Sequence, residues 1–251
     1  MVTHSIIAIG ITEIPEIIAG DDIASKILEA ILKVNLKLKD EDIVVVASKI
    51  VSKAENRLIS AEDIIVSERA KLIAKKSGFD PYQVELALRE SREILRDSGV
   101  LITETHSGLV CNFAGVDKSN TPEGYYILLP EDADVSAERI RKTLVRETRK
   151  QIAVIISDTQ GRPWRKGSVN LAIGCAGISP FKYNRGKRDL YGRILERSTV
   201  CQIDELASLV EPIMGQAGQS IPVVVIRGYE FIDDKENAKA IIRHKDEDLF
   251  R

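Results

Sequence analysis

The sequence is poor in the residues from which disulfide frameworks and zinc sites are built. Its 251 residues include only three cysteines and three histidines. An odd number of cysteines without a Cys-x-x-Cys pair argues against a disulfide framework and a structural zinc site, and no His-x-x-x-His pair places two ligands on one helix face. We therefore expect Cys111, Cys175 and Cys201 to be small buried hydrophobic side chains.

A charge imbalance and long apolar runs are also absent. Lys and Arg total 36 against 38 Asp and Glu, which gives a net charge of −2 and no overall positive field for nucleic acid or an anionic membrane. No apolar run approaches the roughly 18 residues of a membrane span, and no charged segment of a signal peptide precedes the first strand-like stretch. We expect a cytoplasmic protein that binds neither nucleic acid nor a membrane.

The commonest nucleotide and nucleophile motifs are missing as well. There is no Walker P-loop and no Gly-x-Gly-x-x-Gly fingerprint. There is also no Gly-x-Ser-x-Gly elbow, so neither Ser157 nor Ser168 is indicated as a nucleophile. Any nucleotide site in this chain must be built from other elements.

The most informative stretch that is present covers residues 153–165. Its first four residues are apolar and mostly β-branched, and we expect a short buried strand that ends where the polar residues begin. Asp158 and Thr159 would then project into a crevice, with Arg162 and Arg165 close behind. One carboxylate, one hydroxyl and two guanidiniums indicate a divalent cation beside phosphates. The alternative is a simple turn, in which Asp158 accepts backbone N–H groups and the arginines are solvated.

Hydrophobic periodicity predicts strands and helices in irregular alternation. The expected strands cover residues 5–11, 43–47, 100–103, 109–111, 125–129, 169–178 and 221–226. A first helix is expected after a cap at Asp21 or Asp22. Further helices are expected over residues 67–78, 80–95, 136–150 and 199–214. This order predicts an α+β fold with mixed sheets flanked by helices and without Rossmann order. We expect a single unit over residues 1–251, whose length also allows two subdomains, with a helical or frayed tail after Asp233 that carries no chemistry.

Four polar turns stand out, each at the end of a buried strand or helix. They cover residues 48–53, 117–120, 158–165 and 215–220. Each turn alone is ordinary, but their joint occurrence indicates one site. Asp117 and Asp158 could share Mg²⁺ or Mn²⁺, and Thr159 with Gln216 could complete a second position. The phosphate and base contacts would come from Ser48, Lys53 and Asn120.

Five motifs together carry a family resemblance. They cover residues 51–57, 114–120, 157–162, 188–192 and 214–216. In this order they resemble the coenzyme F420-0:L-glutamate ligase (F420 gamma-glutamyl ligase) family, and the resemblance extends from Ile14 to Gly228. It implies a GTP-dependent ligase with a non-Rossmann nucleotide-binding fold, which uses Mg²⁺ or Mn²⁺ at two positions together with K⁺ and works as an intertwined homodimer.

The resemblance also implies roles for individual residues. Asp117 and Asp158 would bind the first metal, and Thr159 and Gln216 the second. Nucleotide contacts would come from Ile14, Pro15, Glu16, Ile17, Ser48, Lys49, Lys53, Asn120, Met214, Gly215, Gln216, Ala217, Gly218, Gln219, Ser220 and Ile221. For charge stabilisation during catalysis we expect Lys53, Arg162 and Arg165.

The chemistry that the resemblance implies is amide formation by way of an activated acid. The γ-phosphoryl group of GTP would pass to the terminal lactyl carboxylate of the deazaflavin F420-0, and the amine of L-glutamate would attack the acyl phosphate. Further glutamates could then follow through γ-linkages. Two other functions stay open on the residues alone: a metal-dependent phosphohydrolase and a non-catalytic module that binds a deazaflavin or nucleotide.

The sequence departs from the family pattern at two positions. Asn56 stands where the family usually has glycine, and asparagine is the residue that next best tolerates a left-handed backbone, so we expect the turn to survive. Gln216 stands where some relatives have a carboxylate, which removes a charge from the implied second metal position.

Overall fold

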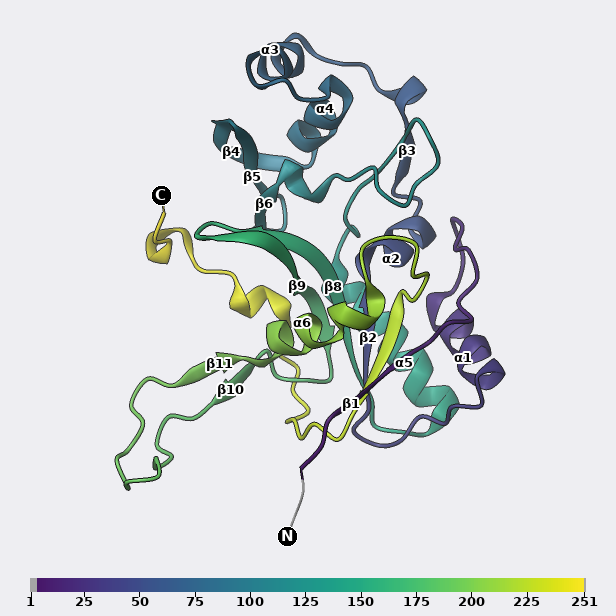
Figure 1. The fold of residues 1–251 in the computed structure, drawn as a ribbon, viewed down its shortest axis with the longest axis vertical. Helices are drawn as coiled ribbons and strands as arrows, with labels where there is room; N and C mark the ends of the chain where they lie inside the picture. Colours follow the sequence, from purple (N-terminus) through teal and green to yellow (C-terminus); the bar gives the residue numbers. More distant parts are fainter. Residues whose placement is uncertain (1–3, 251) are drawn as a thin grey trace.

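The computed structural model describes residues 4–250 and has a mixed five-stranded sheet at its centre (Figure 1). In spatial order the strands are β1 (Ile7–Gly10), β12 (Val223–Arg227), β2 (Ile43–Ala47), β8 (Ala153–Arg162) and β9 (Arg165–Ala176). The β2–β8 pair is parallel and the other pairs are antiparallel. The α+β expectation is confirmed. The predicted single unit covers residues 1–251, and the predicted tail runs to Arg251. Both predictions therefore include residues outside the described range.

Helices cover both faces of this sheet. One face packs against α1 (Ile23–Lys33), α2 (Ser48–Ala54) and α5 (Ala133–Thr148), and the other packs against α6 (Gln202–Met214). Because successive side chains of a strand point to opposite faces, Val44 and Val46 lie in one apolar cluster and Val45 lies in the other. Burial on both faces explains why the central strands are continuous apolar runs in the sequence.

A smaller part of the chain, residues 58–128, has a hydrophobic cluster of its own, and we call it the small lobe. Figure 1 shows it above the main sheet. Its elements are β3 (Leu58–Ser60), α3 (Glu68–Ser77), α4 (Pro81–Arg89), β4 (Ser91–Ser98), β5 (Val100–Thr105), β6 (Val110–Asn112) and β7 (Tyr125–Ile127). The sheet β4–β5–β6 faces the end of the β8–β9 hairpin, so the two parts enclose a space between them.

Two further segments extend from the main body. An arm, residues 181–201, contains β10 (Phe181–Tyr183) and β11 (Thr199–Cys201) and projects beyond α6 (Figure 1). The C-terminal segment, residues 238–250, has two short 3₁₀ helices, Ala238–Ile241 and Lys245–Glu247. Among residues 4–250, no helix combines the length and the apolar composition that crossing a bilayer demands.

Local signals in the sequence placed several element ends correctly. Asp22 caps α1, and Ser67 and Asp80 cap α3 and α4 through side-chain oxygens that accept backbone N–H groups. Gly78 ends α3 in the left-handed conformation. Asn56 has a φ of 57°, so the expectation that asparagine keeps this turn is confirmed.

The strand expected to end before Ser157 is much longer than predicted. β8 continues to Arg162, and Asp158 pairs with Leu171 of β9, so the turn interpretation of Asp158 is also wrong. A register shift lies between Ile156 and Ser157, where the hairpin leaves the buried sheet. Pairing with β9 keeps the polar residues of β8 extended. The sequence of β8 alone does not reveal that β9 is its partner.

Three helix boundaries were also wrong. The helix predicted through Leu95 ends at Arg89, because residues 91–98 pair with β5 as β4. α5 begins at Ala133 rather than at residue 136, because the Asp132 side chain accepts the N–H groups of the first turn. Residues 199–201 form β11, paired with β10, and α6 starts only at Gln202.

Candidate active site

A cavity of about 1620 Å³ lies between the main sheet and the small lobe. It brings together the four polar segments predicted to form one site, together with the loop of residues 14–17. Two of these segments are not the turns that were predicted, since residues 48–53 belong to α2 and residues 158–162 to β8. All the residues predicted to bind metal or nucleotide line this cavity except Gln219. Segments as far apart in the chain as Ile14 and Ile221 therefore converge on one space, as their joint occurrence indicated.

Asp158 is held at the point where the parallel strands β2 and β8 leave the core. Ala47 of β2 pairs with Ser157, so Ser48, the next residue, lies beside Asp158. The Ser48 hydroxyl donates a 2.7 Å hydrogen bond to Asp158 Oδ1. Burial raises the pKa of Asp158 to about 6; the Ser48 hydrogen bond and the charge of Lys49 act against this rise, and the charge of Asp117 adds to it. The site therefore has a half-buried carboxylate whose charged form a nearby positive charge would stabilise.

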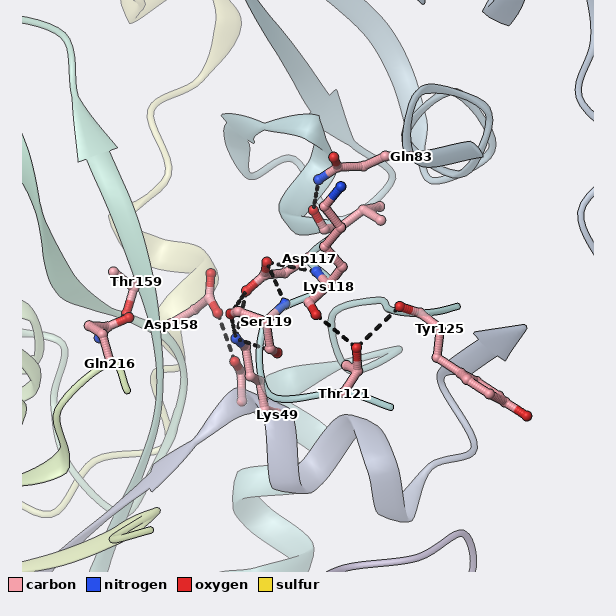
Figure 2. A network of polar contacts seen from close by, with 12 residues as sticks. Lys49, Gln83, Asp117, Lys118, Ser119, Thr121, Tyr125, Asp158, Thr159 and Gln216 are labelled. Atoms are coloured by element: carbon pink, nitrogen blue, oxygen red, sulfur yellow. Dashed lines mark hydrogen bonds and ion pairs between the residues drawn. The ribbon is translucent and has the colours of Figure 1, made fainter. Parts of the chain in front are cut away.

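Asp117 approaches from the small lobe and is surrounded by donors (Figure 2). The Lys49 ammonium lies 2.6 Å from Asp117 Oδ2, and the Ser119 hydroxyl donates to the same oxygen at 2.6 Å. The N–H groups of Lys118 and Ser119 donate to Oδ1. Burial by itself raises the pKa of Asp117, but these donors outweigh it and hold the pKa below its usual value. Asp117 is thus an ionised partner for a cation at neutral pH.

Thr159 and Gln216 meet in a second group of polar atoms. The Gln216 side-chain amide donates to Thr159 Oγ1 at 2.7 Å and to Glu211 Oε1 at 2.8 Å. Thr159 in turn donates to the Asn170 amide oxygen at 2.8 Å. The second carboxylate oxygen of Glu211 is buried without a hydrogen-bond partner. The Glu211 carboxylate thus lies next to Gln216, whose own side chain is uncharged.

Sequence reasoning missed Glu211. It lies in the last turn of α6, ahead of Pro212, and it belongs to none of the motifs that carried the resemblance. A glutamate at the end of an amphipathic helix is ordinarily a solvated side chain. Its approach to Gln216 depends on how the chain turns after Met214, which the sequence does not reveal.

Of the three residues predicted to stabilise charge, two line the cavity and one does not. Lys53 lines the cavity, and its ammonium lies 2.5 Å from Glu16 Oε1, which ties α2 to the loop of residues 14–17. Arg162 also lines the cavity; it donates to the carbonyl of Lys166, and its Nε is buried without a partner. Arg165 is exposed and is not part of the cavity wall.

The turn after α6 forms part of the cavity wall. Gly215 ends the helix with a φ of 66°, a conformation that favours glycine. The Gln219 side chain packs against Gly215 and accepts the N–H of Ala217 at 2.9 Å. This internal role explains why Gln219 supports the turn while its neighbours face the cavity.

The donor set of this site suits a hard divalent cation. Asp117 and Asp158 supply two carboxylates, and cations such as Mg²⁺ ordinarily combine one or two carboxylates with water and phosphate oxygens. Within residues 4–250 no cluster of three or more His, Cys, Asp and Glu side chains has metal-binding geometry. A cation held here would therefore draw its remaining ligands from hydroxyl, amide, water or phosphate oxygens.

Comparison with known proteins gives consistent results. A family model described as F420-0:Gamma-glutamyl ligase matches residues 11–228. A protein of Methanothermobacter thermautotrophicus named coenzyme F420:L-glutamate ligase is 46% identical over 97% of this chain and 98% of its own length. Proteins with the same name from Methanopyrus kandleri and Archaeoglobus fulgidus are 44% identical (92% of this chain and 92% of the relative) and 40% identical (95% and 93%).

Proposed function

This chain belongs to the F420-0:gamma-glutamyl ligase family, and on that premise we propose that it joins L-glutamate to coenzyme F420-0 at the expense of GTP, through an acyl phosphate. The coarser statement, a ligase of coenzyme F420 biosynthesis, follows from the family match over most of the chain. The observation that carries the finer proposal is the pair of carboxylates, Asp117 and Asp158, in one cavity with Lys49 and Ser48.

The proposed reaction balances as two transfers. A carboxylate oxygen of F420-0 attacks the γ-phosphorus of GTP, the bond to the β-phosphate oxygen breaks, and GDP leaves. The amine of L-glutamate then attacks the acyl carbon, phosphate leaves, and the amine proton passes to solvent. The sum is one amide, one GDP and one phosphate for each GTP, and the same cycle on the new γ-carboxylate extends the product by a further glutamate.

In this proposal Asp117 and Asp158 would hold one Mg²⁺ or Mn²⁺, and Thr159 and Gln216, with Glu211, would provide a second position. A bound cation would neutralise phosphate charge and polarise the phosphoryl oxygens. Ser48 keeps Asp158 oriented through its hydrogen bond, and Lys49 does the same for Asp117. A monovalent cation such as K⁺, as the resemblance implies, would add charge next to the phosphates.

The remaining positive groups of the cavity are proposed to bind the nucleotide. Lys53 and Arg162 face the space with cationic side chains. In the turn after α6, the N–H groups of Gly215 and Ala217 donate within the protein, so those of Gln216 and Gly218 are the ones proposed to meet anionic oxygens. Phosphoryl transfer leaves little covalent chemistry to the protein, so positioning and charge neutralisation by these groups would supply most of the rate. Arg165 has no place in this set because it lies outside the cavity wall.

We also propose that the working unit is a homodimer in the cytoplasm. The arm, residues 181–201, projects from the body and has large apolar side chains, Leu190 and Tyr191, that are almost fully exposed. Such side chains on a projecting segment are typical of a contact with a second chain. Sedimentation equilibrium of the purified protein is expected to give twice the chain mass, and a monomer would contradict this part of the proposal.

The test that separates the proposed ligase from its two alternatives is the dependence of phosphate release on substrates. Purified protein is incubated with GTP and Mn²⁺, with F420-0 and L-glutamate added singly and together. A ligase releases multiple turnovers of phosphate only when both are present. Sustained release from GTP alone identifies a phosphohydrolase, and binding of F420-0 without any turnover identifies a binding module.

A further inference from the structure

An exposed tryptophan stands at the tip of the β8–β9 hairpin. Arg162 pairs with Arg165, so Pro163 and Trp164 form the two-residue turn between the strands. Trp164 is 79% exposed and is the only tryptophan of the chain, yet it belongs to the wall of the cavity that contains Asp158. A large aromatic side chain that the fold leaves uncovered at the wall of a ligand-sized cavity is typical of a ligand contact.

The C-terminal segment brings a second aromatic ring to the same place. Phe250 is 62% exposed, lines the cavity, and meets the Trp164 ring edge to face with centroids 5.5 Å apart. Figure 1 shows this end of the chain beside the hairpin tip. No chemistry is expected of this tail from its sequence, and the contact of Phe250 with the cavity differs from that expectation.

Polar anchors place the C-terminal segment on both parts of the molecule. The N–H of Ala238 donates to Asp134 at 2.9 Å, and the Lys239 ammonium lies 2.7 Å from Asp132, so the start of the segment is fixed to α5. Further on, the Lys245 ammonium lies 2.7 Å from Glu93 of β4. Phe250 thus reaches Trp164 from a segment that is attached to the main body and to the small lobe.

The wall of the cavity changes character along β8. Asp158 and Thr159 mark its polar end, and Trp164 lies in the turn just beyond Arg162, which is about 13 Å from Asp158 along the extended strand. The small lobe contributes apolar side chains to the same cavity, from Leu95, Val100, Ile102 and Val110. A molecule with a flat apolar ring at one end and a carboxylate at the other matches this division.

From this arrangement we propose that Trp164, with Phe250, is the contact surface for the deazaflavin ring of F420-0, and that it directs the lactyl carboxylate toward Asp158. The inference rests on the proposed function, since it takes its substrate from there. The ring packs against the aromatic pair and the apolar side chains of β4 to β6, while GTP lies at the polar end. Binding of the acid substrate, rather than of GTP, therefore depends on the hairpin tip.

The direct test uses the single tryptophan as a reporter. F420-0 is titrated into the full-length protein while Trp164 emission is recorded, and we expect saturable quenching because the ring packs against the indole. A parallel titration follows the anisotropy of the deazaflavin's own fluorescence, which reports binding at any position. Binding by anisotropy with unchanged tryptophan emission would overturn the proposal.

Variants then separate ring binding from folding and from catalysis. Trp164→Ala is expected to weaken F420-0 binding about tenfold while the affinity for GTP stays the same, and Trp164→Phe is expected to restore most of it. Phe250→Ala is expected to weaken F420-0 binding less, with Leu249→Ala as its matched control, since Leu249 is exposed and does not line the cavity. Equal F420-0 affinity in Trp164→Ala and the parent would overturn the inference alone.

The same experiment has a different result that would overturn the proposed function itself. A parent protein that neither binds F420-0 nor adds glutamate to it would overturn the proposed function, and the inference with it. A parent protein that adds glutamate normally, next to a Trp164→Ala protein with unchanged KM for F420-0, would leave the ligase intact and remove the ring site.

Discussion

The two walls of the cavity are built in different ways. On the main-sheet side, Asp158 follows strand residues that are fully buried and paired with neighbours on both sides, and Ser48 opens a helix directly after a buried strand. On the small-lobe side, β4 pairs with β5 through two register shifts, and its side chains are only partly buried or exposed. The wall that positions Asp158 is rigid, whereas the wall that we propose to meet the ring of the substrate is more open.

This difference indicates that the two walls have different roles. Phosphoryl transfer demands that charges be held within a fraction of an ångström, and strand ends in a packed sheet provide that. Apolar contact with a ring tolerates small displacements, and short strands with irregular register are sufficient for it. Substitutions on the two walls should therefore fail in different ways.

The largest effect is expected from the carboxylate of the rigid wall. Asp158→Asn keeps the size and the Ser48 contact but removes the charge, so glutamate addition should fall on the order of 10³-fold or more. The melting temperature should stay within a few degrees of the parent, because the side chain lies outside the apolar clusters. Asp63→Asn, at an exposed carboxylate away from the cavity, is the matched control. Full activity in Asp158→Asn would remove this residue from the site.

The core beneath the rigid wall should be the more sensitive to truncation. Ile155 is fully buried, and Ile155→Ala is expected to lower the free energy of unfolding by about 2–5 kcal/mol. Ile94 in β4 is only partly buried, and Ile94→Ala should cost roughly half as much, about 1–2 kcal/mol. Urea denaturation of both variants measures the difference, and equal losses would contradict the contrast between the walls.

The small lobe should also respond to acid. Burial raises the pKa of Asp80, but the Tyr126 hydroxyl, the N–H of Tyr82 and Lys118 outweigh this and hold the pKa below its usual value. A lowered folded-state pKa contributes stability above the unfolded pKa, and this stability is lost as the pH falls through the folded value. Tyr126→Phe should therefore destabilise the protein by about 1 kcal/mol at pH 7 and less below pH 4. Thermal melts across this range test it, and a pH-independent difference would contradict the assignment.

The smallest effect is expected on the open wall. Leu95→Ala removes part of the apolar surface of β4 that faces the cavity, so it should raise KM for F420-0 about fivefold and leave kcat and KM for GTP nearly unchanged. Steady-state kinetics with each substrate varied in turn make the measurement. A fall in kcat without a change in KM would place Leu95 nearer to the chemistry than this account allows.

Local signals in the sequence were enough for much of the fold. The caps at Asp22, Ser67 and Asp80 and the apolar run of β2 depend on neighbouring residues, and the structure confirms them. The course of residues 91–98 and of the polar half of β8 depends on pairing with distant strands. Propensity within one segment does not contain that information, which is why both predictions were wrong.

The candidate site was predictable to a similar degree. The polar stretches around Asp117 and Asp158 were recognisable because each follows apolar residues abruptly, and the structure brings them into one cavity. Glu211 and Phe250 could not be recognised, since one resembles a solvated helix residue and the other lies in a charged tail. Arg165 was expected close behind Asp158 together with Arg162; it pairs with Arg162 across the hairpin, but its side chain is exposed and lies outside the cavity wall.

The most direct test of the central claim is the mass of the deazaflavin after incubation of F420-0 with the purified protein, L-glutamate, GTP and Mn²⁺. The account predicts a product heavier by one glutamyl residue or by several, which disappears when GTP is omitted and when Asp158→Asn replaces the parent. An unchanged mass, from a folded protein that binds GTP, would contradict the ligase assignment.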